Sequence, residues 1–188
     1  MTKKRFFSIR KLHVLVVLIA SLCLSFQHKN STLKNDTDYA RSDVSATLSR
    51  SIDGDTSEFI VDGDKKKVRY LLIDTPETVK SGTPVQPFGT EASNRTKELL
   101  MQAKEIKLSY ENNNRTDKYG RELAYVYVDG ELLQLKLVQE GLARVAYFDK
   151  AEDKTTLNTL LEAQQKAKDH KVGIWSIEGY VSEKGFDQ

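Results

Sequence analysis

The stretch Lys67-Val-Arg-Tyr-Leu-Leu-Ile-Asp-Thr-Pro-Glu77 contains the clearest structural pattern of this sequence. Alternate residues of a strand point to opposite faces, here Val68, Tyr70 and Leu72 on one face and Arg69, Leu71 and Ile73 on the other. The Thr75-Pro76 pair ends such a strand, because proline has no N–H to donate to a sheet. The pattern predicts a strand over residues 67–73 that ends beside two acidic residues, Asp74 and Glu77.

The segments on either side of this strand predict an α+β fold. Strands are expected at 46–52, 58–61, 106–110 and 122–128, and helices at 90–103, 132–140 and 155–168. The order is therefore three strands, a helix, two strands and two helices. A small antiparallel set of five strands avoids exposed edges when it closes on itself. We expect a five-stranded OB-fold β-barrel with three α-helices.

Length and composition bound the class of protein. The chain has 188 residues, of which 39% are hydrophobic and 30% are charged, which indicates one soluble domain and excludes a multi-span membrane protein. A single cysteine excludes an internal disulfide framework and a cysteine-based zinc site.

The first 26 residues predict export. They contain five basic residues and no acidic one, and an apolar run occupies residues 12–26. A basic start before a short apolar run is typical of a secretory signal peptide, so we expect a secreted, extracellular protein. An uncleaved signal-anchor is the alternative; residues 12–26 would then tether the protein to a membrane, facing outside. A polar disordered leader over 27–45, a folded domain over 46–178 and a C-terminal tail over 179–188 are expected to follow.

The expected signal segment hides the charge of the rest of the chain. The whole sequence has 29 basic and 27 acidic residues, a net charge of +2. Without the five basic residues of the segment, 24 basic residues remain against 27 acidic ones, a net charge of −3. A bulk attraction to nucleic acid is therefore not expected, and binding of a polyanion would depend on local groups.

Four carboxylates lie in two turns that neighbouring strands bring close together. Asp53 and Asp55 follow the first strand, and Asp74 and Glu77 follow the third. Clustered carboxylates repel one another unless a cation lies among them. Oxygen ligands without His or Cys favour Ca²⁺, Mg²⁺ or Mn²⁺. The alternative is that these are ordinary turn residues, because Asp and Gly are common in turns.

Two arginines are candidates for binding a phosphate group. Arg69 lies among apolar residues in its strand, and a buried arginine needs a partner. Arg121 opens the fifth expected strand. Two guanidinium groups beside a metal–carboxylate cluster suit phosphate, because each can donate two hydrogen bonds to it. The alternative for each is a solvated surface charge.

Several motifs together resemble the staphylococcal nuclease (thermonuclease) family. They are Ile52-Asp-Gly-Asp-Thr56, Arg69-Tyr-Leu-Leu-Ile-Asp-Thr-Pro-Glu-Thr78, Phe88-Gly-Thr-Glu-Ala92, Arg115-Thr-Asp-Lys-Tyr-Gly-Arg121, Leu123-Ala-Tyr125, Gly141-Leu-Ala143, Val145-Ala-Tyr147 and Ile174-Trp-Ser176. The resemblance covers residues 46–176, nearly all of the expected folded part. It implies an OB-fold barrel with three helices and a Ca²⁺-dependent nuclease that cleaves DNA and RNA and leaves 3′-phosphate ends.

The resemblance also implies a role for each site residue. The ligands of one Ca²⁺ would be Asp55, Asp74 and the backbone carbonyl of Thr75, with Asp53 next to them. Glu77 would be the general base, and Arg69 and Arg121 would clamp the phosphate. The residues implied to contact the nucleotide are Lys118, Tyr119 and Tyr147.

The sequence departs from the family pattern in two places. The loop 80–86 is less basic than in staphylococcal enzymes, and Asp149 stands where the best-known members have a second tyrosine. We expect these changes to affect substrate affinity more than the reaction. The rival function is a non-catalytic OB-fold module that binds nucleic acid or protein. A monomer is expected in either case.

Overall fold

The computed structural model describes residues 42–78 and 84–187. The expected signal segment 1–26, the apolar run 12–26 and the leader up to residue 41 lie outside the described residues. The first strand, β1 (Ser42–Asp53), begins four residues before the expected start of the folded domain at Ala46. Residues 42–46 pair with β5 (Ile106–Tyr110), so the end of the expected leader is part of the sheet. Within the described ranges, no helix is both long and apolar enough to cross a membrane.

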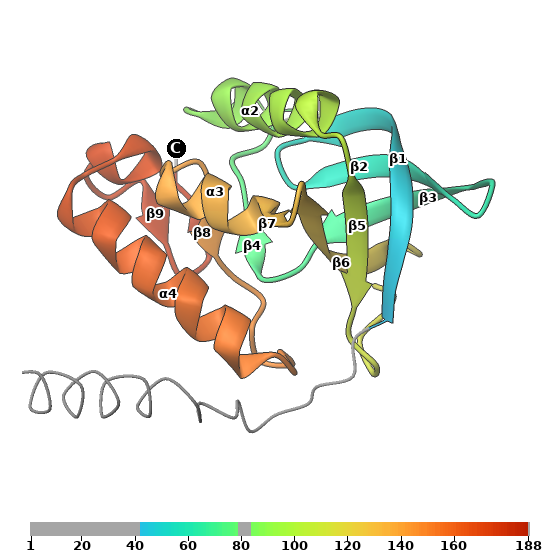
Figure 1. Cartoon of the computed structure of the whole chain (residues 1–188). Coiled ribbons are helices and arrows are strands. Elements are labelled where there is room, and N and C mark those ends of the chain that lie inside the picture. The colour runs from blue at the N-terminus through green and yellow to red at the C-terminus, as the bar shows by residue number, and fades with distance from the viewer. Residues whose placement is uncertain (1–41, 79–83, 188) are drawn as a thin grey trace, which may run out of the picture. The chain divides into compact units, whose positions relative to one another are not determined.

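Five strands close into the expected barrel (Figure 1). They are β1, β2 (Thr56–Val61), β3 (Asp64–Tyr70), β5 and β6 (Glu122–Val128). Neighbours pair in the order β3-β2-β1-β5-β6, all antiparallel, and β3 then pairs with β6 in parallel to close the ring. A two-residue strand, β7 (Glu131–Leu132), extends the sheet beside β6. The prediction of an α+β fold with an OB-type barrel is confirmed.

The third strand is shorter than expected. The alternation of its residues predicted one strand over 67–73, which is wrong: β3 ends at Tyr70, and Leu72 has a left-handed backbone with φ of 65°. After this bend the chain forms β4 (Ile73–Asp74), which leaves the barrel and pairs with β8 (Arg144–Val145). The Arg69 side chain holds the bend, because its Nη1 donates to the carbonyls of Tyr70 and Ile73 at 3.3 and 2.8 Å.

Three helices follow, as predicted, at α2 (Gly89–Gln102), α3 (Leu133–Gln139) and α4 (Lys154–Asp169). Helix α2 packs on β1, and α3 lies between β6 and α4 (Figure 1). A buried amide anchors α3 to the barrel: Gln134 accepts from Val126 N–H at 3.1 Å and donates to the Ala124 carbonyl at 3.2 Å. The helix face that carries Leu133 and Leu137 is fully buried.

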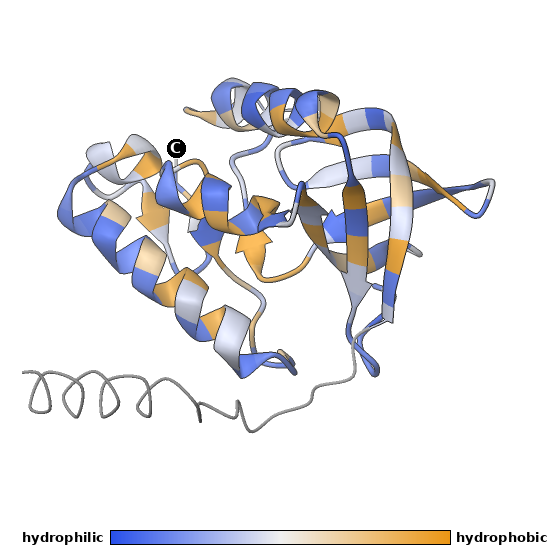
Figure 2. Cartoon of the chain, in the orientation of Figure 1, coloured by the Kyte–Doolittle hydropathy of each residue, from blue (hydrophilic) through white to orange (hydrophobic). Residues whose placement is uncertain are grey.

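Buried apolar residues of the barrel strands and of the helices form one core cluster. Figure 2 shows the hydrophobic positions distributed along these strands and helices. Large residues with no exposed surface include Phe59 and Leu108 from strands and Leu137 and Leu160 from helices. Burial of each such side chain contributes about 1.5–3 kcal/mol. The core therefore fixes the ends of β1, β3 and β4, where the acidic residues lie.

The C-terminal residues are ordered rather than a tail. A short 3₁₀ helix, η1 (Gly173–Ser176), precedes β9 (Val181–Ser182) and β10 (Gly185–Phe186), which pair as a hairpin. Tyr180 is buried at the base of this hairpin. The expected boundary at residue 178 therefore does not mark the end of ordered structure.

The end of α3 and the start of η1 approach each other through two glycines. Gly141 and Gly173 both have positive φ, 63° and 55°, and Ile174 N–H donates to the Gly141 carbonyl at 2.8 Å. A Cβ on Gly173 would lie 2.1 Å from the Gly141 oxygen, and one on Gly141 would lie 2.2 Å from the Val172 oxygen. Both contacts are with backbone, which cannot rotate away.

We expect Gly173→Ala to lower the free energy of unfolding by about 2 kcal/mol or more, from backbone clash and left-handed strain together. Gly63→Ala is the control, because Gly63 also has positive φ but nothing lies within 4 Å of its added Cβ. The control should cost about 1 kcal/mol. Urea titration followed by circular dichroism measures both, and equal losses would contradict the close approach.

Candidate active site

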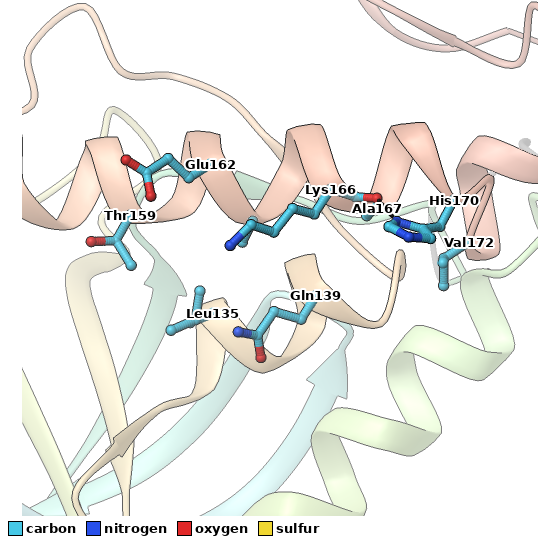
Figure 3. A pocket seen from close by; sticks show the side chains of 9 residues that line it. Leu135, Gln139, Thr159, Glu162, Lys166, Ala167, His170 and Val172 are labelled. Carbon is cyan, nitrogen blue, oxygen red and sulfur yellow. Dashed lines mark hydrogen bonds between the residues drawn. The ribbon is translucent and has the colours of Figure 1, made fainter.

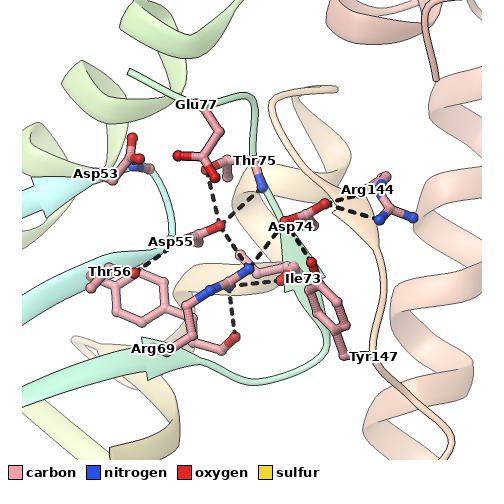
Figure 4. Close-up of polar contacts among 12 residues, drawn as sticks. Asp53, Asp55, Thr56, Arg69, Ile73, Asp74, Thr75, Glu77, Arg144 and Tyr147 are labelled. Carbon is pink, nitrogen blue, oxygen red and sulfur yellow. Dashed lines mark hydrogen bonds and ion pairs between the residues drawn. The ribbon is translucent and has the colours of Figure 1, made fainter. Parts of the chain in front are cut away.

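The two acidic turns meet as the sequence predicted (Figure 4). The prediction that β1 and β3 are neighbouring strands is wrong, because β2 lies between them in the sheet. Asp55 lies between β1 and β2, and its Oδ2 accepts from the backbone N–H and the Oγ1 of Thr75, at 3.1 and 3.2 Å. Gly54 permits this approach, because a Cβ there would lie 2.6 Å from Thr75 Oγ1. Helix α2 supports the turn, since Thr96 Oγ1 donates to the Gly54 carbonyl at 2.6 Å.

Arg69 links the two turns electrostatically. Its Nη2 lies 3.0 Å from Asp55 Oδ2 and 3.1 Å from Asp74 Oδ1, and the residue is only 9% exposed. Burial raises the pKa of Asp74, the charge of Asp55 raises it further, and the guanidinium of Arg69 opposes the rise. Asp55 and Asp74 are therefore the partners that Arg69, a buried strand arginine among apolar residues, was expected to need.

Arg144 is a site residue that the sequence analysis did not single out. It lies in β8, is buried, and its Nη2 and Nε contact Asp74 Oδ2 at 2.9 and 3.0 Å. Its charge also opposes the rise in the pKa of Asp74. The sequence pattern that identified Arg69 could also have identified Arg144. It is an arginine between apolar neighbours in a strand, and the neighbours of Arg144 are Ala143 and Val145.

Asp53 and Glu77 complete the acidic cluster. Asp53 Oδ1 accepts from Gly54 N–H at 2.8 Å and from Thr78 Oγ1 at 2.7 Å, and burial raises the pKa of this carboxyl. The Glu77 carboxylate points into the same cluster (Figure 4). Its backbone is fixed on both sides by Gln86: Glu77 N–H donates to Gln86 Oε1 at 2.8 Å, and Gln86 N–H donates to the Glu77 carbonyl at 3.0 Å.

A pocket of about 560 Å³ gathers the predicted substrate-binding residues next to this cluster. Its lining includes Arg69, Lys118, Tyr119, Arg121 and Tyr147. Asp149, which stands at the departure from the family pattern, also lines it. Arg69, which lies in β3, and Arg121, which immediately precedes β6, thus line one cavity, as the phosphate interpretation required.

Arg121 is held in place through one edge only. Its Nε donates to Asp117 Oδ2 at 2.7 Å, and its backbone N–H donates to Asp117 Oδ1 at 2.9 Å. Burial of Asp117 is outweighed by these hydrogen bonds, which lower the pKa of its carboxyl. Neither Nη1 nor Nη2 of Arg121 hydrogen-bonds to another residue within the described ranges. Those nitrogens are available to an anion.

An exposed tyrosine lies beside each arginine of the pocket. The Arg69 guanidinium is 5.5 Å from the ring centre of Tyr147, and that of Arg121 is 5.6 Å from the ring centre of Tyr119. Tyr147 and Tyr119 are 69% and 72% exposed, which is unusual for aromatic rings that serve only packing. Tyr147 also has a left-handed φ of 56°, and its hydroxyl donates to Asp74 Oδ1 at 3.3 Å. Such backbone strain is concentrated at functional sites.

The donor set fits a hard divalent cation. Among the described residues, no group of three or more His, Cys, Asp or Glu side chains is arranged to hold a metal. The predicted ligand set needs only two carboxylates, Asp55 and Asp74, with the Thr75 carbonyl as the third oxygen. Both carboxylates contact the same nitrogen of Arg69, so the two groups lie close enough for one cationic atom to contact both. An all-oxygen set of this kind, completed by water, suits Ca²⁺.

A second cavity, of about 240 Å³, lies between α3 and α4 and contains none of these groups (Figure 3). Leu135, Ala163 and Val172 form its apolar part, and Lys166 and His170 lie on α4 or at its end. None of the predicted site residues lines it, so this cavity is not a candidate for the active site.

Several nucleases are similar in sequence to most of this chain. The chain is 51% identical over 144 residues to the endonuclease YncB of Bacillus subtilis, covering 77% of this chain and 67% of that protein. It is 49% identical to the SPbeta prophage-derived endonuclease YokF of the same organism, over 77% of this chain, and spans about half (48%) of that relative. Thermonuclease of Staphylococcus intermedius is 41% identical over 165 residues, 86% of this chain and 95% of that protein.

The family comparison agrees with the barrel and with the site. Residues 67–177 match the family described as staphylococcal nuclease homologue, a range that includes Arg69, Glu77, Arg121 and Arg144. Because this match covers more than half of the sequence and the relatives exceed 30% identity over most of it, the chain belongs to the staphylococcal nuclease family.

Proposed function

We propose that this chain is a Ca²⁺-dependent nuclease that hydrolyses phosphodiester bonds of DNA and RNA and leaves 3′-phosphate ends. One observation carries the proposal: Arg69 and Arg121 face a single pocket beside a carboxylate cluster. The names of the relatives, endonuclease and thermonuclease, support the same reaction class. The proposal comprises endonuclease activity on both kinds of nucleic acid.

The two arginines would hold the phosphate being attacked. Arg121 presents both Nη groups to the pocket, since only its Nε is engaged by Asp117. Arg69 is held through both Nη groups by carbonyls and carboxylates, so it would bind the phosphate through its Nε or by exchanging a carboxylate contact for one to the phosphate. Donors that are already oriented where negative charge develops provide the largest part of many rate accelerations. The exposed rings of Tyr119 and Tyr147 would stack on flanking bases.

Glu77 would act as the general base. Its carboxylate points into the cluster from a backbone that Gln86 holds at both the N–H and the carbonyl. The carboxylate accepts a proton from water, the water oxygen forms a bond to phosphorus, and the P–O5′ bond breaks. The 5′ oxygen leaves as a hydroxyl after taking up a proton from solvent, and the phosphate stays on the 3′ side. A carboxylate needs to lie within hydrogen-bond reach of the water for this step.

Asp55, Asp74 and the Thr75 carbonyl would hold Ca²⁺, which when bound supplies positive charge against the charge that grows on the phosphate. The chain's own contribution is the arrangement of these oxygens. Thr75 fixes Asp55 through two hydrogen bonds, and Arg144 fixes Asp74 through two contacts to Oδ2. Asp53 adds negative charge beside them.

Export belongs to the proposal as well, on the evidence of the basic start and the apolar run in residues 1–26. The protein would act outside the cell, either released after cleavage or held by residues 12–26. Fractionation of producing cells into medium and membrane, followed by immunoblotting, distinguishes the two forms, and a protein found only in the cytoplasm would contradict both.

We expect residues 27–188 to cleave single-stranded DNA and RNA with Ca²⁺ and to be inactive with chelator. Gel analysis of labelled oligonucleotides measures cleavage, and phosphatase treatment of the products identifies 3′-phosphate ends. Tight binding without cleavage at any Ca²⁺ concentration would support the non-catalytic OB-fold module instead.

We expect Glu77→Gln and Arg121→Ala each to lower kcat/KM by about 10²-fold to 10³-fold, as loss of one charge-stabilising or proton-accepting group does. Glu91→Gln in the first turn of α2 and Arg50→Ala in β1 are the matched controls, because both are exposed and outside the pocket. Circular dichroism checks that all four variants fold. Near-parental turnover of both site variants would exclude the assigned roles.

We expect Ca²⁺ to strengthen nucleotide binding as well as to permit turnover. The part without residues 1–26 carries a net charge of −3, so attraction of a polyanion depends on local positive groups. Titration calorimetry with a non-cleavable oligonucleotide, with Ca²⁺ and with chelator, measures the difference. Equal affinity in both conditions would refute this dependence.

A further inference from the structure

We propose that the hairpin formed by residues 180–186, here called the C-terminal hairpin, is a positioning element of the active site. It would hold Arg144 against Asp74 on one side and Gln86 against Glu77 on the other. The expected effect on the reaction rate rests on the proposed nuclease function. The link between the hairpin and the residues Arg144 and Gln86 rests on their contacts alone. The hairpin lies beyond residues 67–177, the range that matches the family.

The first arm of this link reaches the cluster through Arg144. Its Nη1 donates to the Glu183 carbonyl at 3.4 Å, and its guanidinium lies 5.8 Å from the ring centre of Phe186. The opposite edge of the same guanidinium contacts Asp74. The side chain is 9% exposed, so the hairpin covers a charge that would otherwise meet water. An ion pair shielded in this way is stronger than one at the surface.

The second arm reaches Glu77 through Gln86. The Phe186 carbonyl accepts from Gln86 Nε2 at 3.4 Å, and Gln86 Oε1 in turn accepts from Glu77 N–H at 2.8 Å. The next residue is held as well, because the buried Tyr180 hydroxyl donates to the Pro87 carbonyl at 2.7 Å. Tyr180 remains a donor at any physiological pH, since burial raises the pKa of its hydroxyl to about 12.

The hairpin joins the two arms because it is itself tied together. The rings of Tyr180 and Phe186 lie 5.4 Å apart, and Asp187 N–H donates to the Tyr180 carbonyl at 2.8 Å. Phe186 also pairs with Val181 across the two strands. One residue, Phe186, thus contacts Arg144 with its ring and Gln86 with its carbonyl. Truncation of the ring removes the Arg144 contact directly, and it loosens the Gln86 arm by removing the ring contact with Tyr180 that helps to hold the Phe186 backbone in place.

Loosening the hairpin is expected to lower the rate by displacing the reacting groups rather than by lowering the stability of the fold. A displacement of about 1 Å in a reacting group costs up to about 10²-fold in rate. Arg121 and Tyr119 lie in the pocket, and within the described ranges neither has a hydrogen bond, ion pair or ring contact with the hairpin, so substrate binding should persist when the hairpin loosens. The expected signature is a fall in kcat with little change in KM.

The test compares Phe186→Ala with Phe186→Tyr in the full chain. We expect Phe186→Ala to lower kcat about tenfold with KM changed less than about twofold, and Phe186→Tyr to restore most of the loss. Val61→Ala in β2 is the control, a buried truncation that lowers stability without contacting the hairpin. All assays run below the unfolding transition of each variant. An equal fall in kcat for Val61→Ala would show that the loss of activity comes from lower stability of the fold, and it would overturn the proposal.

Hydrogen exchange supplies a readout that does not depend on activity. The amides of Glu77 and Gln86 are both hydrogen-bonded between these two residues. In Phe186→Ala we expect both amides to exchange about tenfold faster, while amides of β5 stay unchanged. Parental exchange rates in Phe186→Ala would overturn the proposal. If the parent protein cleaves no nucleic acid, the proposed function fails, and exchange alone decides whether the hairpin positions Glu77.

Discussion

The buried guanidinium of Arg69 is the interaction on which the rest of this structure depends. Two carboxylates from turns about 20 residues apart in sequence, Asp55 and Asp74, contact one nitrogen of this side chain. The other nitrogen holds the carbonyls of the bend that ends β3. Removal of this single charge would leave buried anions unpaired and the bend unsupported, which is costly in a desolvated place. Arg69 is thus both a residue of the barrel strand β3 and a residue of the candidate active site.

The same arrangement prepares the site for a cation and an anion at once. The pKa of Asp74 is raised by burial and by Asp55, and only the two arginines around it favour its charged form. A divalent cation would act in the same direction as those arginines and stabilise the charged form of both carboxylates. Under the proposed function, negative charge at the two carboxylates is in place before the metal binds, and positive charge at Arg121 is in place before the phosphate binds. Protein groups that are already oriented need little reorganisation during reaction.

The secondary structure and the acidic turns could be predicted from the sequence, whereas contacts between distant segments could not. The strands, helices and acidic turns follow from local patterns, because alternation, helical spacing and Asp-Gly turns are short-range signals. The break at Leu72 could not be read, since it depends on Arg69 satisfying two carbonyls from the same side. The role of Arg144 next to Asp74 was missed because β4 and β8 pair only in three dimensions. The C-terminal hairpin was missed for the same reason, as Tyr180 finds its partner 93 residues earlier in the chain.

The contact between Arg144 and Asp74 spans 70 residues of sequence, and this separation has a consequence for partly folded forms. A chain whose barrel has formed but whose β8 has not yet docked would already contain every carboxylate and both phosphate-binding arginines. Asp74 would nevertheless lack one of its two cationic neighbours, and β4 would lack its pairing strand. For the proposed nuclease, the catalytic arrangement is therefore a property of the completed unit, and local opening at β8 alone would disturb it reversibly. Enzymatic turnover would then act as a sensor of the last docking step in folding.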